Sequence, residues 1–175
     1  MILFRHADPR FLFLWEHQEQ PPGRWHGGTE GPVHYLADTP DGAWAEFLRH
    51  EGIQTEAEAA NVRRALWAIE VQDPLRPATP RPPRQTLTGG INTYEDCRAE
   101  ARRLRAAGHT ALRAPSAALA PGDARGWRVD GGLQPGPARD GVIFVFFGPR
   151  PDLIGWAATE AGRPPSDLLA RVRHL

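Results

Sequence analysis

Residues 33–52 read VHYLADTPDGAWAEFLRHEG, and this stretch decides the fold class because it predicts a strand and a helix in direct succession. Val33–Ala37 is short and mostly apolar, as expected of a β-strand. Thr39 suits the N-cap of the helix, Pro40 its first position and Gly52 its C-terminal stop. The helix has an apolar stripe formed by Ala43, Trp44, Phe47 and Leu48.

Further strands are predicted on both sides of this unit. The strand candidates are residues 2–15, with a break at Asp8-Pro9, then 62–71, 111–113 and 142–147. The last of these reads VIFVFF and is apolar on both faces, which places it in the centre of a sheet.

The rest of the chain predicts two more helices and two long loops. One helix runs from about Thr93 to Ala107, with Thr93 and Asp96 as a weak capping box, and a short one begins at Ser166. Five prolines within 74–83 predict an extended loop, and the Gly- and Pro-rich segment 121–141 predicts another. Without repeats or a second core, residues 1–175 are expected to form one α+β domain with small mixed or antiparallel sheets.

Composition narrows the function classes. The 21 basic residues are all arginine and are balanced by 21 acidic ones, so the zero net charge gives no reason to expect nucleic acid or an anionic membrane as a partner. The single cysteine, Cys97, excludes an intramolecular disulfide and a thiolate zinc cluster, and the histidines show no metal-ligand spacing. The first residues do not resemble a signal peptide, and no apolar run is long enough to span a membrane, so we expect a cytoplasmic protein.

Four residues carry candidate chemistry, although each also has an ordinary structural interpretation. Arg24, in a Gly-Arg-Trp turn, can bind a phosphate in a two-pronged geometry or cap carbonyls. Tyr35 lies in the middle of a predicted strand, where tyrosines are usually core residues. Glu46 lies beside the apolar stripe of its helix, where most glutamates are solvated, and Ser116 follows Pro115 as a typical turn residue.

Taken in order, these motifs resemble the RES domain, a family of bacterial toxins that degrade NAD. The resemblance rests on Gly23-Arg24-Trp25, the strand around Tyr35, the Ala-x-x-Glu pattern ending at Glu46 and the strand that ends in Pro115-Ser116. Phe4-Arg5 also looks like the first strand of the family. The resemblance implies a fold similar to ADP-ribosyltransferases, with NAD held in a cleft between two small sheets.

The resemblance also implies roles for individual residues. Glu46 would stabilise the positive charge that develops on the ribose when nicotinamide leaves, and Arg24 would neutralise the diphosphate. Tyr35 would stack on the nicotinamide or close the pocket, and Ser116 would bind the ribose or orient Glu46. His26 stands where many members have Asn, so it either contacts ligand or packs on Trp25. NAD is the implied substrate, and no metal is needed.

The implied function is an NAD glycohydrolase or phosphorylase. Two alternatives stay open: an ADP-ribosyltransferase that modifies a protein or nucleic acid, and a non-catalytic nucleotide-binding module. Members of the family usually act with an antitoxin, so a helix-turn-helix protein is the expected partner. Trp25, beside Gly27-Gly28, is a candidate anchor for such a partner; the alternative is that Trp25 packs its turn against the core.

Overall fold

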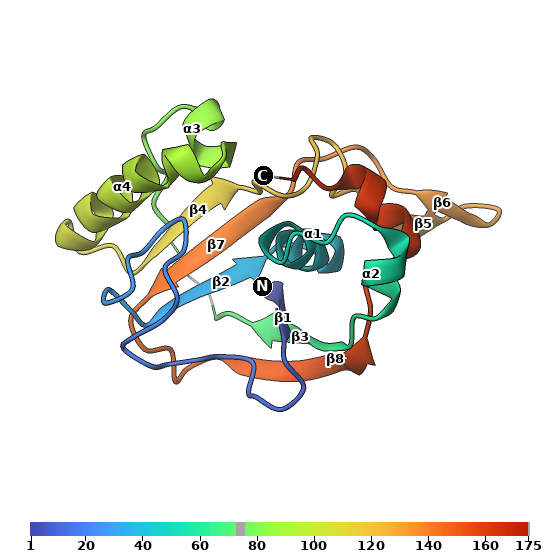
Figure 1. The fold of residues 1–175 in the computed structure, drawn as a ribbon, viewed down its shortest axis with the longest axis horizontal. Coiled ribbons are helices and arrows are strands. Elements are labelled where there is room, and N and C mark those ends of the chain that lie inside the picture. The colour runs from blue at the N-terminus through green and yellow to red at the C-terminus, as the bar shows by residue number, and fades with distance from the viewer. Residues whose placement is uncertain (73–75, 175) are drawn as a thin grey trace.

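The computed structural model describes residues 1–72 and 76–174, and its centre is a six-stranded sheet (Figure 1). The strands follow the order β4-β7-β2-β1-β3-β8, and every neighbouring pair is antiparallel. Their bounds are β1 Ile2–Ala7, β2 Val33–Ala37, β3 Arg64–Glu70, β4 Ala111–Pro115, β7 Val142–Phe147 and β8 Ile154–Gly162. The predicted α+β class is confirmed, and the apolar strand β7 lies in the interior of the sheet, as expected.

Helices and a small hairpin surround this sheet. The helices are α1 Pro40–His50, α2 Glu56–Ala60, α3 Arg84–Thr88 and α4 Tyr94–Ala106, with 3₁₀ turns η1 Ile91–Thr93 and η2 Ser166–Arg171. The hairpin pairs β5 Trp127–Val129 with β6 Leu133–Pro135 and extends away from the sheet (Figure 1). Within the described ranges, no helix is long and apolar enough to cross a membrane.

The sheet is divided at its middle. β1 and β2 pair through Phe4 and Ala37, whereas β1 pairs with β3 from Ile2 to Ala7 and β2 pairs with β7 along its whole length. Two well-paired halves, β4-β7-β2 and β1-β3-β8, are therefore joined at one position and diverge beyond it. This divergence makes room for the cavity described below.

The helix α1 forms as its sequence predicts. Thr39 Oγ1 accepts a hydrogen bond from the amide of Gly42 at 3.0 Å, and Pro40 occupies the first turn. The residues of the apolar stripe are all at least 95% buried and pack into the core beside β1 and β2. Glu46 projects from the side of this stripe, so packing of α1 fixes the position of its carboxylate.

The strand prediction needs two corrections. The first strand ends at Ala7, because Asp8 starts a turn in which its carbonyl accepts from the amide of Phe11. Leu12 and Trp15 are then 78% and 54% exposed, so the apolar run from 11 to 15 is not a strand. The edge strand β8 was not predicted, because its Gly- and Ala-rich sequence has little strand signal and its order comes from pairing with β3.

Other predicted segments are partly right. The helix from Thr93 is confirmed as α4, but Thr93 Oγ1 donates to the carbonyl of Gly90 instead of capping the helix, so the capping box is wrong. The loop 121–141 contains the hairpin β5-β6, and the helix at Ser166 is a 3₁₀ turn with Leu168 buried. Residues 76–83 form the expected extended loop; Pro74 lies outside the described residues.

Candidate active site

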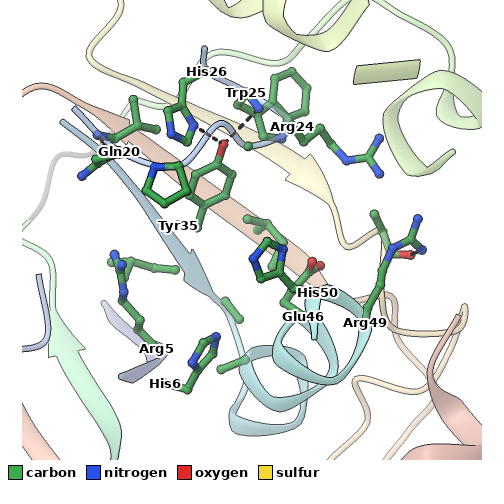
Figure 2. A pocket seen from close by; sticks show the side chains of 18 of the residues that line it. Arg5, His6, Gln20, Arg24, Trp25, His26, Tyr35, Glu46, Arg49 and His50 are labelled. Carbon is green, nitrogen blue, oxygen red and sulfur yellow. Dashed lines mark hydrogen bonds between the residues drawn. The ribbon is translucent and has the colours of Figure 1, made fainter. Parts of the chain in front are cut away.

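A cavity of about 400 Å³ opens where β1 and β2 diverge (Figure 2). Its size is within the range of small-molecule sites. Arg24, His26, Tyr35 and Glu46 line this cavity, whereas Ser116 lies behind Glu46 and contacts it. The fold therefore brings all five residues proposed from the sequence to one place.

The carboxylate of Glu46 is held by a fully engaged hydroxyl. Ser116 Oγ donates to Glu46 Oε1 at 2.8 Å, and the same Oγ accepts from the amides of Ala118 at 3.2 Å and Leu119 at 3.1 Å. Because both acceptor positions of the hydroxyl are used, its single proton is directed at the carboxylate. The amide of Ala118 also lies 3.4 Å from Oε1, so this end of Glu46 is fixed while the carboxylate faces the cavity.

The hydroxyl of Tyr35, another residue that lines the cavity, is also held by hydrogen bonds from the protein. It accepts from the amide of Trp25 at 3.0 Å and lies 2.8 Å from His26 Nδ1 (Figure 2). Burial raises the pKa of the Tyr35 phenol and lowers the pKa of His26, so both groups are neutral near pH 7. Since the Tyr35 hydroxyl already accepts from Trp25, we assign its proton to the bond with Nδ1, which places the His26 proton on Nε2. Nε2 is buried and has no partner among the described residues.

Gly23 is required by this arrangement. A Cβ atom at residue 23 would lie 2.6 Å from the Tyr35 hydroxyl and 2.9 Å from the ring of His26. The Gly-Arg-Trp turn therefore needs glycine for close approach, and this explains why the turn and the strand around Tyr35 belong to one structural unit.

Arg24 lines the cavity, but its guanidinium is already bound to protein oxygens. Nη2 donates to the carbonyl of Gly89 at 2.6 Å, and Nη1 donates to Thr93 Oγ1 at 3.1 Å and to the carbonyl of Thr86 at 3.4 Å. The same group lies 4.5 Å above the ring of Tyr94. The carbonyl-capping interpretation of Arg24 thus describes its contacts here, and the sequence-based role in binding diphosphate stays a prediction.

Arg49, which sequence reasoning did not single out, supports the same wall. It is 93% buried, and its Nη2 donates to the carbonyl of Gly89 at 2.9 Å, the acceptor that Arg24 also uses. Its Nη1 donates to the carbonyls of Ala117 and Arg173. Arg49 therefore connects α1 to the loop that carries Ser116.

Two other arginines line the opposite end of the cavity and differ from Arg24 and Arg49. Arg5 Nη1 and Arg64 Nε are buried and have no hydrogen-bond partner among the described residues. Burial, together with the charge of Arg64, lowers the pKa of Arg5 to about 10, so Arg5 is still protonated near pH 7. The other Arg64 nitrogens have partners, because Nη1 lies 4.0 Å from Asp8 Oδ2 and Nη2 lies 3.4 Å from His6 Nδ1. Two guanidinium groups that line one cavity and keep a nitrogen without a partner favour an anionic ligand.

His6 lies beside these two arginines and lines the same end of the cavity. It lies 3.4 Å from Arg64, and burial and the charges of Arg64, Arg5 and His50 lower its pKa to about 3. The imidazole of His6 is therefore neutral near pH 7. Of the two arginines, Arg5 lies in a strand that the sequence predicts. Arg64 comes close to it only because β1 pairs with β3, and local sequence does not reveal this pairing.

The proposal that Trp25 anchors a partner is wrong. Trp25 is 2% exposed and belongs to the hydrophobic core, while His26 is 4% exposed. The alternative interpretation, in which Trp25 packs its turn against the core, is correct. Among residues 1–72 and 76–174, no group of three or more His, Cys, Asp or Glu side chains is arranged to hold a metal ion.

Comparisons with known proteins agree with this architecture. One chain of the crystal structure of the M. tuberculosis MbcT–MbcA toxin–antitoxin complex is similar, with a TM-score of 0.59, 18% sequence identity, and coverage of 97% of this chain and 86% of that chain. No curated protein matches the sequence. The family model of the RES domain matches residues 2–127, which is more than half of the chain, and the chain therefore belongs to the RES domain family.

Proposed function

We propose that this protein consumes NAD by breaking the bond between nicotinamide and ribose. The observation that carries the proposal is a single cavity with a carboxylate fixed by Ser116 on one side and buried, unpartnered guanidinium nitrogens on the other. NAD has matching features, because its glycosidic carbon becomes positive during cleavage and its diphosphate is negative.

Glu46 would act on the ribose. When the bond between C1′ and the pyridine nitrogen breaks, both electrons leave with neutral nicotinamide and C1′ becomes oxocarbenium-like. A carboxylate that is already oriented stabilises this charge without reorganising, which is the most effective form of electrostatic catalysis. With water as the acceptor, its oxygen bonds to C1′ and one proton is released, which gives ADP-ribose.

Arg5 and Arg64 would bind the diphosphate. Both side chains line the cavity, and their guanidinium groups would donate charge-assisted hydrogen bonds to phosphate oxygens, which are stronger than neutral ones. The nitrogens Arg5 Nη1 and Arg64 Nε, which have no partner among the described residues, would need a small side-chain rotation to take part. Arg24 would shape the wall between diphosphate and ribose, and a direct contact from it would require a bond to Gly89 or Thr93 to be exchanged.

Tyr35 would contact the nicotinamide. Its ring lines the cavity, and the bonds of its hydroxyl to Trp25 and His26 fix the plane of that ring. A fixed aromatic side chain can stack on a planar pyridinium at little cost in conformational entropy. In this proposal the main role of His26 is to orient Tyr35, and His26 touches the ligand only as part of the cavity wall.

The acceptor of ADP-ribose is open between water, phosphate and a macromolecule, because the carboxylate chemistry at C1′ is the same for all three. A nucleotide-binding module without turnover would use the same cavity. Since the similar solved structure is a toxin–antitoxin complex, we also propose that an antitoxin, of the helix-turn-helix type, restrains this protein in the cytoplasm, where its substrate is present.

The direct test is to incubate the purified protein with NAD, with and without phosphate, and to separate the products by chromatography. Release of nicotinamide together with ADP-ribose or its phosphate ester is expected. A lysate with labelled NAD would detect transfer to a macromolecule. If calorimetry detects binding of ADP-ribose but no nicotinamide is released from NAD, the protein is a nucleotide-binding module and not an enzyme.

A further inference from the structure

We infer that Arg173 is a positioning residue that holds the Ser116 loop, residues 116–120, so that the Ser116 hydroxyl meets Glu46. Its guanidinium does not line the cavity; Nη2 donates to the carbonyl of Ser116 at 2.8 Å from behind. The inference rests on the proposed function for its kinetic consequence, but its structural part can be tested without any activity.

The Ser116 loop is supported by residues 171–173 along its length. The amide of Arg173 donates to the carbonyl of Ala118 at 2.7 Å, and the amide of Ala120 donates to the carbonyl of Arg171 at 2.9 Å. Between these two bonds, Leu119 and Val172 form an antiparallel bridge. Backbone pairing thus attaches the far part of the loop, from Ala118 onward.

The near part of the loop has one backbone bond, from the amide of Ser116 to the carbonyl of Gly141 at 2.9 Å, and its carbonyls are held by side chains. Ser116 is 3% exposed, so its carbonyl needs a protein donor, and that donor is Arg173 Nη2. The next carbonyl, of Ala117, accepts from Arg49, and Arg49 also donates to the carbonyl of Arg173 at 2.9 Å. Two guanidinium groups therefore hold the peptide units on either side of Ala117.

This arrangement couples the loop to the helix that carries Glu46. Arg49 and Glu46 are three residues apart on α1, so one helix provides both the carboxylate and one of the donors that hold the loop. Loss of the Arg173 guanidinium would leave the Ser116 carbonyl buried without a donor, which is costly, and the peptide would rotate toward solvent or another donor. The Ser116 hydroxyl would then move away from Glu46 Oε1.

The kinetic test is a double-mutant cycle of Arg173→Ala and Ser116→Ala, with release of nicotinamide as the readout. Arg173→Ala should lower kcat by roughly 10-fold and leave KM within about 2-fold, because a small displacement of a catalytic group costs rate. Arg173→Lys should recover most of the loss, since one ammonium donor can reach one carbonyl. Arg163→Ala, at an exposed position, is the matched control.

The double variant separates positioning from general destabilisation. If Arg173 acts through Ser116, the double variant should have the kcat of Ser116→Ala alone, because residues acting in one network are not additive. If the fold-losses in kcat of the two single variants multiply in the double variant, the inference is overturned. It is also overturned if kcat falls in proportion to the melting temperature across all variants.

An activity-independent measurement covers the case in which NAD is not the substrate. Residue-resolved amide hydrogen exchange should show faster exchange of Ala118 and Leu119 in Arg173→Ala, because both amides are bonded to Ser116 Oγ. Arg163→Ala should leave them protected. Unchanged protection in Arg173→Ala would refute the inference, whereas absent turnover in the wild type with faster exchange in Arg173→Ala would refute the proposed function alone.

Discussion

The two ends of the cavity differ in how their charged groups are supported. At the carboxylate end, the oxygen of Glu46 is bonded to Ser116, and Ser116 is bonded to two further amides. At the guanidinium end, Arg5 and Arg64 have buried nitrogens without a partner in the described part of the chain. At one end an oxygen of the catalytic candidate is held by the protein, and at the other end hydrogen-bonding capacity is unused.

This contrast supports the proposed division of roles, in which the carboxylate end carries out the chemistry and the guanidinium end binds. A catalytic group must hold its position within fractions of an ångström, so it needs partners from the protein. A binding group gains most when its partner is the ligand, although burial without a partner reduces the stability of the free protein. The experiments below test this division of roles, from the largest expected effect to the smallest.

Glu46→Gln should have the largest effect. It removes the charge but keeps the size of the side chain, so kcat should fall by roughly 100- to 10,000-fold because a single electrostatic contact is lost in the transition state. Glu56→Gln, at an exposed position in α2, is the control and should keep full activity. Nicotinamide release measures both. A Glu46→Gln variant with unchanged turnover would show that the carboxylate end is not catalytic.

Ser116→Ala should reduce kcat by roughly 10- to 100-fold while ADP-ribose binds with similar affinity. The hydroxyl orients Glu46 but does not line the cavity, so its loss affects the reaction more than binding. Kinetics and calorimetry on the same preparation measure the two quantities. A loss of affinity equal to the loss of rate would assign Ser116 to ligand binding instead.

Arg5→Met should show the opposite behaviour. The affinity for ADP-ribose should fall by roughly 10-fold, whereas the affinity for adenosine, which has no phosphate, should not change. The free energy of unfolding should stay equal or rise by about 1 kcal/mol, because an unsatisfied buried cation is replaced by an apolar side chain.

The matched control for Arg5→Met is Arg128→Met, at an exposed position in the hairpin. Calorimetry and urea unfolding give the two free energies for each variant. Equal losses of affinity for ADP-ribose and adenosine would refute the assignment of Arg5 to the diphosphate, whatever the stability of the variant.

The smallest effect concerns His6, whose pKa is lowered from 6.5 to about 3 in the folded protein. Below pH 6.5 the unfolded chain binds a proton that the folded protein rejects, so His6 makes stability decrease as pH falls from 6.5 toward 3. The expected slope is at most about 1.4 kcal/mol per pH unit. His6→Gln should remove this part of the slope in urea unfolding between pH 7 and pH 4.

His34 has a pKa that is lowered to about 4, mainly by burial. It therefore adds a second decrease of stability with falling pH, which remains in the His6→Gln variant.

ADP-ribose should raise the pKa of His6, because its phosphates would offset the charges of Arg5 and Arg64. Proton titration followed by NMR would detect this. A His6 pKa that does not respond to ADP-ribose would place the diphosphate elsewhere.

The sequence predicted those parts of the fold whose order is local. The helix α1 has its cap at Thr39 and its stripe within eleven residues, and β7 is apolar throughout, so each was recognisable. β8 was not, because its conformation is imposed by β3, and the turn after Ala7 was missed because the apolar run at 11–15 resembles a strand.

The candidate site could be predicted as a set of residues but not as a set of contacts. Motif order brought Arg24, Tyr35, Glu46 and Ser116 together, and all four meet at the cavity or directly behind it. The guanidinium of Arg24 binds carbonyls, whereas one nitrogen of Arg5 has no partner among the described residues. This difference depends on residues more than 50 positions away in the sequence. Such long-range pairing has no local sequence signal.

The single pairing of Phe4 with Ala37 has a consequence for the design of inhibitors. Beyond this pair, β1 and β2 are not paired with each other and residues of both strands line the cavity, so backbone amides and carbonyls on their facing edges need partners other than the neighbouring strand. A compound that fills the space with apolar groups would leave these amides and carbonyls without partners and lose affinity for that reason. An effective inhibitor would need an extended edge of alternating donors and acceptors, so that it continues the sheet as a short additional strand between its two halves.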